Sequence, residues 1–479
     1  MRLRELIAGA EVAATRGDLD VELSALAYDS RKVAPGTLFF CVPGGKVDGH
    51  EFAAAAVEAG ASALVVEREL DLAVAQVVVA DTRAAMAPLA ARFWSDPTKE
   101  LKVVGITGTN GKTTTAFLLE AILEQAGIQT GLLGTVKQVV GGVEEQVERT
   151  TPEAIELQAT FRRMLESDDE ACVMEVSSHA LALHRADAIE FEAALFTNLT
   201  QDHLDFHADM EDYFQAKRML FEAGPRAAIV NLDDPSGRRL AGEFECLTFS
   251  AEGSGADFVA HDIAFDVAGA RFAVDGPEGS IEIETALPGH FNVSNALGAF
   301  AAALSLGVDS ESAAAGLAAA GRVPGRFEPI AEGQDFAVLV DYAHTPDSLE
   351  NVLLAARRLT EGRVISVFGA GGDRDRDKRP KMGRAGAELS DLAIVTSDNP
   401  RSESPEAIIA EVVDGIEDAD GVEVEPDRRA AIRLALGRAQ AGDTVVIAGK
   451  GHEQGQEFED GRKLPFDDRA VAREELARL

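Results

Sequence analysis

The segment GITGTNGKTTT, residues 105–115, groups glycines, a lysine and threonines in a spacing that suits phosphate chemistry. The apolar run from Val103 precedes it, and the helix-like stretch TTTAFLLEAILEQAG follows it. In such a strand–loop–helix arrangement, backbone N–H groups face a phosphate chain, Lys112 neutralises its charge and Thr113 offers a hydroxyl to a magnesium ion. Ile106 stands where the strict G-x-x-x-x-G-K-[ST] pattern has its first glycine. Despite this departure, we interpret the segment as a nucleoside triphosphate site.

Two further segments offer ligands for that cation. Glu175 lies in the apolar run CVMEV, one residue before its end, at the place where a P-loop enzyme has its second metal-binding acid; the alternative is a solvated strand end. The segment TNLTQDHLDFH, residues 197–207, carries His203 and His207, which would share a face if the segment were helical. Because Leu204 fills the glutamate position of H-E-x-x-H, a zinc protease site is excluded. We therefore expect one or two groups of this cluster near a nucleotide-bound cation.

A site of another kind is indicated by SDNPRSESP, residues 397–405, which follows an apolar run. It places an acid, an amide, a proline and a guanidinium on one tight turn, as Asp398, Asn399, Pro400 and Arg401. A surface turn needs asparagine and proline but has no use for the opposed charges. A small molecule that carries both an ammonium and a carboxylate would need both. The alternative is a solvent-exposed Asn-Pro turn.

The elements that must position these residues form three blocks, and we predict domains at 1–98, 99–325 and 326–479. A chain of 479 residues is too long for one core. Each block alternates strand-like runs with helix-like stretches, a pattern typical of parallel, doubly wound α/β sheets. Ligands bind beyond the carboxyl ends of the strands in such sheets, which is where the polar motifs fall. The strand candidates are TLFFCV, SALVVE and QVVVA in the first block, CVMEV, ALFTNL and AAIVNL in the second, and FAVLVDYAH, RVISVFGAGG, LAIVTSDNP and TVVIAGKGHE in the third.

Composition excludes several classes of protein. The formal charge of −37 argues against nucleic-acid binding, because phosphate backbones would be repelled. The three cysteines form no C-x-x-C pair, which suits a reducing cytoplasm. The stretch FNVSNALGAFAAALSLGV, residues 291–308, lacks charge, but its asparagines and alanines favour a buried, capped helix over a membrane span. We expect a cytoplasmic protein with no membrane span.

Ordered motifs along the whole chain resemble those of the Mur ligases, ATP-dependent amide-forming enzymes of peptidoglycan precursor synthesis. The motifs are DSRKVAPGTLFFCV (29–42), GTNGKTTT (108–115), TTPE (150–153), EVSSHALALHR (175–185), YFQAKRMLF (213–221), GHFNVSNALGA (289–299), PGRFE (324–328), DYAHTPDSLENVL (341–353), GAGGDRDRDKRPKMG (369–383), DNPR (398–401) and GKGHE (449–453). The likeness is greatest to the members that add the third residue of the stem peptide. It implies an N-terminal uridine-binding domain, a central P-loop ATPase domain and a C-terminal Rossmann-like domain. We expect a monomer.

The resemblance assigns roles by position. For ATP it implies Gly108, Thr109, Asn110, Gly111, Lys112, Thr113, Thr114, Asn292, Arg326 and Asp341. For the UDP-muramoyl-dipeptide it implies Ser30, Thr150, Thr151, Ser177 and Arg185. For the incoming amino acid it implies Arg374, Asp398, Asn399, Pro400, Arg401, Gly449 and Glu453. For magnesium it implies Thr113, Glu175, His203 and Lys217, and for catalysis Lys112, His203 and Lys217. Leu183 stands where some relatives have a glutamine that contacts the substrate.

Lys217 has two interpretations. Its spacing from Phe214 and Leu220 is that of an ordinary lysine on a helix, whose stem packs while its ammonium reaches water. The resemblance implies instead that carbon dioxide carbamylates it. An ammonium beside magnesium and a triphosphate adds repulsion between cations, whereas a carbamate changes +1 to −1 and can help to hold a metal.

The resemblance also implies a two-step reaction. The D-glutamate γ-carboxylate of UDP-N-acetylmuramoyl-L-alanyl-D-glutamate attacks the γ-phosphoryl group of ATP, and an amine then attacks the acyl phosphate. We predict that this amine belongs to meso-diaminopimelate, because Arg401 can pair with the carboxylate that L-lysine lacks. The alternatives are an L-lysine-adding enzyme, another ligase of the superfamily such as folylpolyglutamate synthetase, and a P-loop GTPase. The sequence lacks the N-K-x-D-type guanine motif that a GTPase would need.

Overall fold

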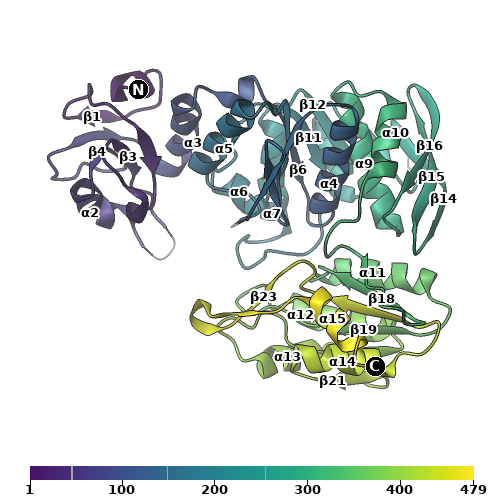
Figure 1. Cartoon of the computed structure of the whole chain (residues 1–479). Helices are drawn as coiled ribbons and strands as arrows, with labels where there is room; N and C mark the ends of the chain where they lie inside the picture. The colour runs from purple at the N-terminus through teal and green to yellow at the C-terminus, as the bar shows by residue number, and fades with distance from the viewer. Residues whose placement is uncertain (45–46, 148, 254) are drawn as a thin grey trace. The chain divides into compact units, whose positions relative to one another are not determined.

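The structure is a computed structural model that describes residues 1–44, 47–147, 149–253 and 255–479 (Figure 1). The chain divides into two compact units. The first contains residues 1–105, 128–194 and 216–226, and the second contains 106–127, 195–215 and 227–479. Three elements carry residues of both units, namely β6 (Lys102–Thr107), β11 (Phe191–Phe196) and α7 (Met210–Glu222).

The N-terminal part of the first unit is a five-stranded sheet of order β1-β5-β4-β3-β2, in which β1 is antiparallel to β5 and the other neighbours are parallel. Successive residues of β3 enter different cores. Leu38 and Phe40 pack with α1 and α3, whereas Phe39 packs with α2. Helices therefore cover both faces of this sheet (Figure 1). The bounds are α1 Leu3–Leu6, β1 Ala14–Arg16, β2 Ala25–Ala27, β3 Thr37–Phe40, α2 Ala53–Glu58, β4 Ala61–Val66, β5 Ala75–Val78 and α3 Thr82–Phe93, with short 3₁₀ turns at Ser30–Lys32, Gly49–Phe52 and Pro97–Lys99.

The rest of the first unit contains strands in the order β6-β10-β7-β8-β9. Strand β10 is parallel to β7. Strand β8 is antiparallel to both β7 and β9, and the sequence did not predict these antiparallel pairs. The predicted strand CVMEV corresponds to β10, all of whose residues are buried, and Glu175 is its last residue. The bounds are β7 Thr130–Leu133, β8 Gln138–Val140, β9 Val143–Glu145, α5 Ala154–Glu166, β10 Ala171–Glu175 and α6 Ser178–Ala182.

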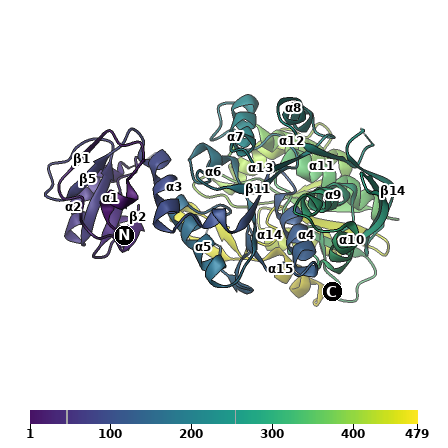
Figure 2. The ribbon, with the colours of Figure 1, turned by 90° about the horizontal axis from the view of Figure 1, so that it is seen from above.

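The second unit begins with strands in the order β16-β15-β14-β13-β12-β11. Strands β12, β13 and β14 are parallel, whereas β14, β15 and β16 form an antiparallel meander that the sequence did not predict. Helices α4, α9 and α10 pack against one another (Figure 2). The bounds are α4 Lys112–Gln125, β12 Ala227–Asn231, α8 Pro235–Glu243, β13 Leu247–Ser250, β14 Phe258–Asp266, β15 Gly269–Gly276, β16 Gly279–Thr285, α9 His290–Ser305 and α10 Ser310–Ala319.

The predicted charge-free helix is α9, and most of its residues are buried. Its N-cap is Gly289, which makes no side-chain cap hydrogen bond, so the asparagines lie inside the helix and do not cap it. Among the residues that the structure describes, no helix combines the length and the apolar character that crossing a membrane requires.

The C-terminal part of the second unit is a six-stranded sheet of order β17-β18-β22-β19-β20-β21. The four strands from β22 to β21 and the pair β18–β22 are parallel, and β17 is antiparallel to β18. One face packs against α11, α12 and α13, and the other packs against α14 and α15 (Figure 2). The bounds are β17 Glu328–Pro329, β18 Ala337–Asp341, α11 Pro346–Leu359, β19 Val364–Phe368, α12 Lys378–Leu389, β20 Leu392–Val395, α13 Pro405–Val413, β21 Val422–Val424, α14 Arg428–Arg438, β22 Thr444–Ala448, β23 Gly455–Glu457, β24 Lys463–Pro465 and α15 Asp468–Leu476.

Candidate active site

The glycine-rich loop between β6 and α4 has the conformation that a phosphate-binding loop needs. Gly108 has φ +152°, and a Cβ there would lie 1.8 Å from Thr197 Oγ1. Gly111 has φ +87°, and a Cβ there would lie 2.3 Å from Asn295 Oδ1. Other residues would be strained and would clash at both positions. The loop therefore leads directly into the N-terminus of α4, as the sequence predicted.

Lys112 and Thr113 begin α4; Lys112 contacts the loop, and Thr113 contacts Arg326. Lys112 Nζ donates to the carbonyl oxygens of Gly108 and Thr109, each at 2.9 Å. Arg326 Nη2 donates to Thr113 Oγ1 at 3.0 Å, and its guanidinium lies 4.4 Å from the ring centre of Tyr342. Two predicted ATP residues from distant parts of the sequence, Thr113 and Arg326, are thus in direct contact.

The remaining predicted ATP residues except Asp341 lie in the loop itself, in α4 or in α9. Thr109 Oγ1 lies 3.1 Å from the hydroxyl of Tyr213, and Asn110 Nδ2 donates to Asp347 Oδ2 at 2.9 Å. Thr114 is buried in the first turn of α4. Asn292 Nδ2 donates to the carbonyl of Pro288 at 2.8 Å.

Asp341 ends strand β18 and is buried. It accepts hydrogen bonds from the backbone N–H groups of Phe327 at 2.6 Å and Ala343 at 2.7 Å. Burial raises the pKa of its carboxyl group to about 6, although Arg326 and these N–H groups oppose the rise. A carboxyl group whose pKa is shifted in this way is common near functional sites.

Asp202 is the centre of the His-Asp segment. Its carboxylate lies 3.4 Å from His203 Nε2, 3.8 Å from His344 Nε2 and 3.6 Å from Lys378 Nζ. Burial disfavours the charged carboxylate, but these cationic groups hold its pKa well below the usual range. The sequence placed Asp202 in a cluster of which one or two groups were expected near a cation. It assigned no role to His344 or Lys378, because their proximity to Asp202 depends on the tertiary fold. His203 has φ +57°, and the segment up to His207 is not helical, so the condition for a shared helical face is not met.

Two loops of the C-terminal domain lie side by side at the carboxyl ends of β19 and β20. We call them loop 369–374 and loop 396–402. Gly372 N donates to the carbonyl of Asn399 at 2.9 Å, and Ser402 N donates to Asp373 Oδ2 at 3.2 Å. A Cβ on Gly372 would lie 1.9 Å from the carbonyl oxygen of Pro400, so the contact requires glycine.

Arg401 belongs to loop 396–402 and contacts loop 369–374. It has φ +51°, and its side chain is 26% exposed, so its guanidinium remains within reach of a ligand. Nη1 donates to the carbonyl of Gly372 at 2.7 Å, and Nε donates to Glu457 Oε2 at 3.1 Å. A Cβ on Gly371 would lie 3.1 Å from Arg401 Nη1 and 3.8 Å from Arg374 Cγ, so both predicted arginines are neighbours of this glycine. Arg374 Nη1 also lies 3.4 Å from Asp205 Oδ2.

The other predicted amino-acid-binding residues form a buried polar cluster. Lys450 Nζ, which the sequence did not assign, donates to Asn399 Oδ1 and to Glu453 Oε2, each at 2.8 Å. Asn399 Nδ2 also donates to Glu453 Oε2, at 2.9 Å. Asp398 is buried, and its Oδ2 atom has no hydrogen-bond partner among the described residues. Gly449 would place a Cβ 2.4 Å from this oxygen. The motif GKGHE contained Lys450, so it was the signal that could have found this residue.

In the first unit, Thr151, Ser177 and Arg185 lie together. Thr151 Oγ1 donates to the carbonyl of Glu175 at 2.8 Å and accepts from Ser177 N at 3.1 Å. Arg185 Nη1 donates to the carbonyl of Thr151 at 3.3 Å. Arg185 Nε is buried and has no hydrogen-bond partner in the described part of the chain. Three predicted substrate residues are thus neighbours, and one retains a hydrogen-bond donor for a ligand.

Glu153, in the TTPE motif, is a buried carboxylate that the sequence did not assign. It lies 3.0 Å from Arg185 Nη2, 3.1 Å from Arg149 Nη1 and 3.5 Å from Arg83 Nη1. One carboxylate among three guanidinium groups leaves positive charge, which suits an anionic substrate. Ser30 begins a 3₁₀ turn elsewhere in this unit and is half-buried.

Glu175 and Lys217 are both buried, at 1% exposure each. Glu175 accepts from Thr135 N at 2.7 Å and from Thr135 Oγ1 at 3.1 Å, and Thr135 Oγ1 lies 3.0 Å from Thr150 Oγ1. The solvated-carboxylate alternative for Glu175 is therefore wrong. The same holds for the alternative that the Lys217 ammonium reaches water.

The residues proposed for magnesium have suitable chemistry. Carboxylate and hydroxyl oxygens, as in Glu175 and Thr113, are the hard ligands that Mg²⁺ prefers. Within the described ranges, no group of three or more His, Cys, Asp or Glu side chains is placed to hold a metal by itself. Magnesium usually binds through one or two carboxylates together with substrate phosphates, so these residue types fit a cation that arrives with ATP.

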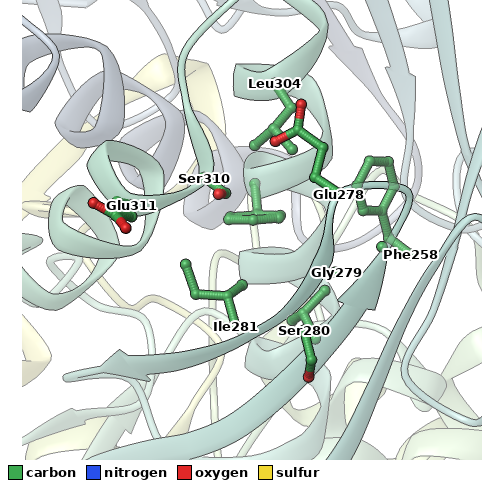
Figure 3. Close-up of a pocket in the computed structure, with 11 residues that line it drawn as sticks. Phe258, Glu278, Gly279, Ser280, Ile281, Leu304, Ser310 and Glu311 are labelled. Atoms are coloured by element: carbon green, nitrogen blue, oxygen red, sulfur yellow. The ribbon is translucent and has the colours of Figure 1, made fainter.

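A pocket of about 220 Å³ lies elsewhere in the second unit, between the β14–β16 meander and helices α9 and α10 (Figure 3). Phe258, Phe300 and Leu304 form its apolar wall, and Glu278 and Glu311 also line it. None of the predicted site residues is among its lining residues in the described structure. This pocket is therefore not the site that the motifs predict.

Together, the nucleotide loop and the three-part α/β architecture are those of an ATP-dependent ligase. The chain belongs to the Mur ligase family. Three family models match it, namely the Mur ligase family catalytic domain at residues 22–94, the Mur ligase middle domain at 106–303, and the Mur ligase glutamate ligase domain at 325–451.

Individual relatives are similar over their full length. A UDP-N-acetylmuramoyl-L-alanyl-D-glutamate–2,6-diaminopimelate ligase of Syntrophomonas wolfei is 47% identical, over 99% of each chain. The ligase of the same name from Gloeobacter violaceus is 48% identical, over 100% of this chain and 98% of its own. A solved structure with this name is 33% identical, with a TM-score of 0.71 and coverage of 100% of this chain and 99% of its own.

Proposed function

We propose that the protein joins meso-diaminopimelate to UDP-N-acetylmuramoyl-L-alanyl-D-glutamate at the expense of ATP, in cytoplasmic peptidoglycan precursor synthesis. The observation that carries the proposal is the charged cluster at the carboxyl ends of the C-terminal strands. It combines the half-buried guanidinium of Arg401 with the buried carboxylate of Asp398, on a fold whose relatives bear this ligase name. A substrate with a carboxylate beside an ammonium matches this pair of charges.

The first step is phosphoryl transfer from ATP to the γ-carboxylate of the D-glutamate, which gives an acyl phosphate and ADP. Lys112 is positioned in the loop to exchange its bonds with the Gly108 and Thr109 carbonyls for contacts with phosphate oxygens. Arg326, which contacts Thr113, adds a second positive charge at the same helix N-terminus. Both would disperse the charge that develops on the transferred group. Asn292 and Asp341 complete the proposed ATP site.

In the second step, the amine of the incoming amino acid attacks the acyl carbonyl, and the tetrahedral intermediate expels phosphate as the amide bond forms. Asp398, Asn399 and Glu453 would hold the ammonium at the far end of diaminopimelate, and Arg401 would pair with the carboxylate there. Arg374, Pro400 and Gly449 would complete the pocket. No side chain of the protein is required as a nucleophile.

Magnesium, when bound, would neutralise phosphate charge, and Thr113, Glu175, His203 and Lys217 would hold it. We propose that Lys217 is carbamylated. Its burial supports this, because a buried ammonium beside a cation would repel it, whereas a carbamate would offer it oxygen ligands.

The muramoyl-dipeptide would be anchored by the first unit. Thr151, Ser177 and Arg185 are neighbours there, and Thr150 lies beside Thr135. Ser30 would contact the uridine part. We propose domains at 1–98, 99–325 and 326–479 for UDP-sugar, ATP and amino acid respectively, in a monomeric, cytoplasmic protein.

A panel of substrates tests the proposal. Purified protein should release ADP only when the UDP-muramoyl-dipeptide and diaminopimelate are both present, with mass spectrometry of the product as confirmation. Ligation of L-lysine at equal efficiency would support the alternative L-lysine-adding enzyme. Activity with a folate substrate in place of the UDP-muramoyl-dipeptide would contradict the proposal.

A further inference from the structure

A fully buried ion pair lies beneath the proposed amino-acid pocket. It joins Arg428, the first residue of α14, to Asp468, the first residue of α15, and both side chains have 0% exposure. The contact is bidentate, with Nε to Oδ1 at 2.8 Å and Nη2 to Oδ2 at 2.7 Å. Burying two charges is costly and often adds no stability compared with an apolar pair of similar volume. The pair therefore calls for an explanation other than stability.

The guanidinium of Arg428 also contacts the ends of two strands. Nη2 donates to the carbonyl of Ala448 at 2.9 Å, and Nη1 donates to that of Ser397 at 3.4 Å. Ala448 is the last residue of β22, and Ser397 follows the end of β20. The residues just beyond these carbonyls are Gly449 and Asp398, both proposed to contact the substrate. Arg428 thus fixes the spacing between the segment that follows β20 and the segment that follows β22.

Charge reinforces this spacing. A Cβ on Gly449 would lie 2.4 Å from Asp398 Oδ2 and 3.5 Å from Arg428 Nη2, so the carboxylate and the guanidinium approach the same glycine. The buried Asp398 nevertheless keeps its Oδ2 without a hydrogen-bond partner in the described structure. Burial disfavours its ionisation, but Lys450 and Arg428 lower its pKa. The result is a charged acceptor that is held in place and still available.

We propose that the Arg428–Asp468 pair is a positioning device for the amino-acid pocket: it holds Asp398 and Gly449 in the geometry that binds the ammonium of the incoming amino acid. Asp468 orients Arg428 through two hydrogen bonds, and Arg428 orients the two strand ends. This inference rests on the proposed function of the pocket. Neither residue contacts the substrate itself, so both are positioning residues.

The test replaces both charges together, because removing one partner would leave an unpaired buried charge and unfold the domain. The double variant Arg428→Met with Asp468→Leu should fold, with a thermal midpoint near that of the wild type. Its KM for diaminopimelate should rise about tenfold or more, the scale on which a loosened site loses productive geometry, while its KM for ATP stays within about twofold. A folded double variant with the wild-type KM for diaminopimelate would overturn the inference.

Arg428→Lys provides a second measurement, which decides the matter if the double variant does not fold. Lysine keeps the charge but cannot make the bidentate bond to Asp468 and reach both carbonyls. We expect a raised KM for diaminopimelate here too, and an unchanged KM would overturn the inference. Arg363→Met is the matched control. Arg363 pairs with Asp443 at 2.7 Å at the opposite end of β22, so its loss should lower the thermal midpoint without changing that KM.

The wild-type assay separates this inference from the proposed function. If the wild type ligates no diaminopimelate, the proposed function fails whatever the variants do. If the wild type is active and both Arg428 variants bind diaminopimelate normally, the positioning role alone fails.

Discussion

Replacing Arg401 by alanine is expected to weaken the binding of diaminopimelate and to leave the KM for ATP unchanged. The guanidinium already donates Nε to Glu457 and one Nη1 hydrogen to the carbonyl of Gly372. The second Nη1 hydrogen and the Nη2 group remain for the substrate, which allows two parallel hydrogen bonds to its carboxylate. The variant loses both bonds.

The magnitude follows from these contacts. A hydrogen bond to a charged group contributes about 1.5–3 kcal/mol, so two would contribute about 3–6 kcal/mol. Glu457, which pairs with Nε at 3.1 Å, neutralises part of the charge of the guanidinium and favours the lower end. A loss of about 3 kcal/mol corresponds to a fall of ~10²-fold in kcat/KM for diaminopimelate. This is below the ~10⁴-fold limit for a site that rejects a substrate lacking a polar group.

The assay is steady-state ligation with diaminopimelate or L-lysine at saturating ATP and UDP-muramoyl-dipeptide. The control is Arg433→Ala. Arg433 lies in α14, is 55% exposed and pairs with Glu475 of α15. Its kinetics should match the wild type. The reasoning is refuted if Arg401→Ala retains the wild-type KM for diaminopimelate, or if the wild type uses L-lysine as efficiently as diaminopimelate.

Three further predictions concern the nucleotide site. Lys112→Ala should abolish ligation, because it removes the cation of the loop, while circular dichroism stays unchanged; near-normal product formation would contradict the P-loop role. Lys217→Ala should be almost inactive and partly rescued by short-chain carboxylic acids, and absence of a 44 Da adduct on the wild-type lysine peptide would count against carbamylation. Because burial raises the pKa of Asp341 to about 6 from 3.8, the stability that this group contributes is complete below pH 3.8 and is lost as the pH rises through 6. Relative to Asp341→Asn, the wild type should lose about 2 kcal/mol of unfolding free energy between pH 4 and pH 7, measured by denaturant titration.

Local signals predicted much of this molecule. The strand–loop–helix around Lys112 was readable because glycine spacing, an apolar run and a helix-forming stretch are contiguous in the sequence. The parallel strands of the C-terminal sheet were readable as short, continuous apolar runs such as VISVF and TVVIA. The helix from His290 was also predicted, but the prediction that its asparagines cap it was wrong.

Features that depend on distant segments were not predicted. The arginines around Glu153 come from α3, from the segment before α5 and from the segment after α6, so no local pattern indicates their meeting. The β14–β16 meander was missed because its residues alternate between buried and exposed without a long apolar run. The surroundings of Asp202 likewise depend on α12 and on the segment after β18.

The close fit of loops 369–374 and 396–402 has a consequence for redesign. A Cβ on Gly369 would lie 2.2 Å from the carbonyl oxygen of Thr396, and one on Gly372 would lie 1.9 Å from that of Pro400. The backbone of each loop therefore limits the conformation that the other can adopt. If only the DNPR segment were replaced by that of an enzyme with another amino-acid preference, the new segment would not fit against loop 369–374. The two loops should therefore be transplanted as a pair. Natural changes of amino-acid preference in this fold face the same requirement, and each should leave a matched substitution in both loops.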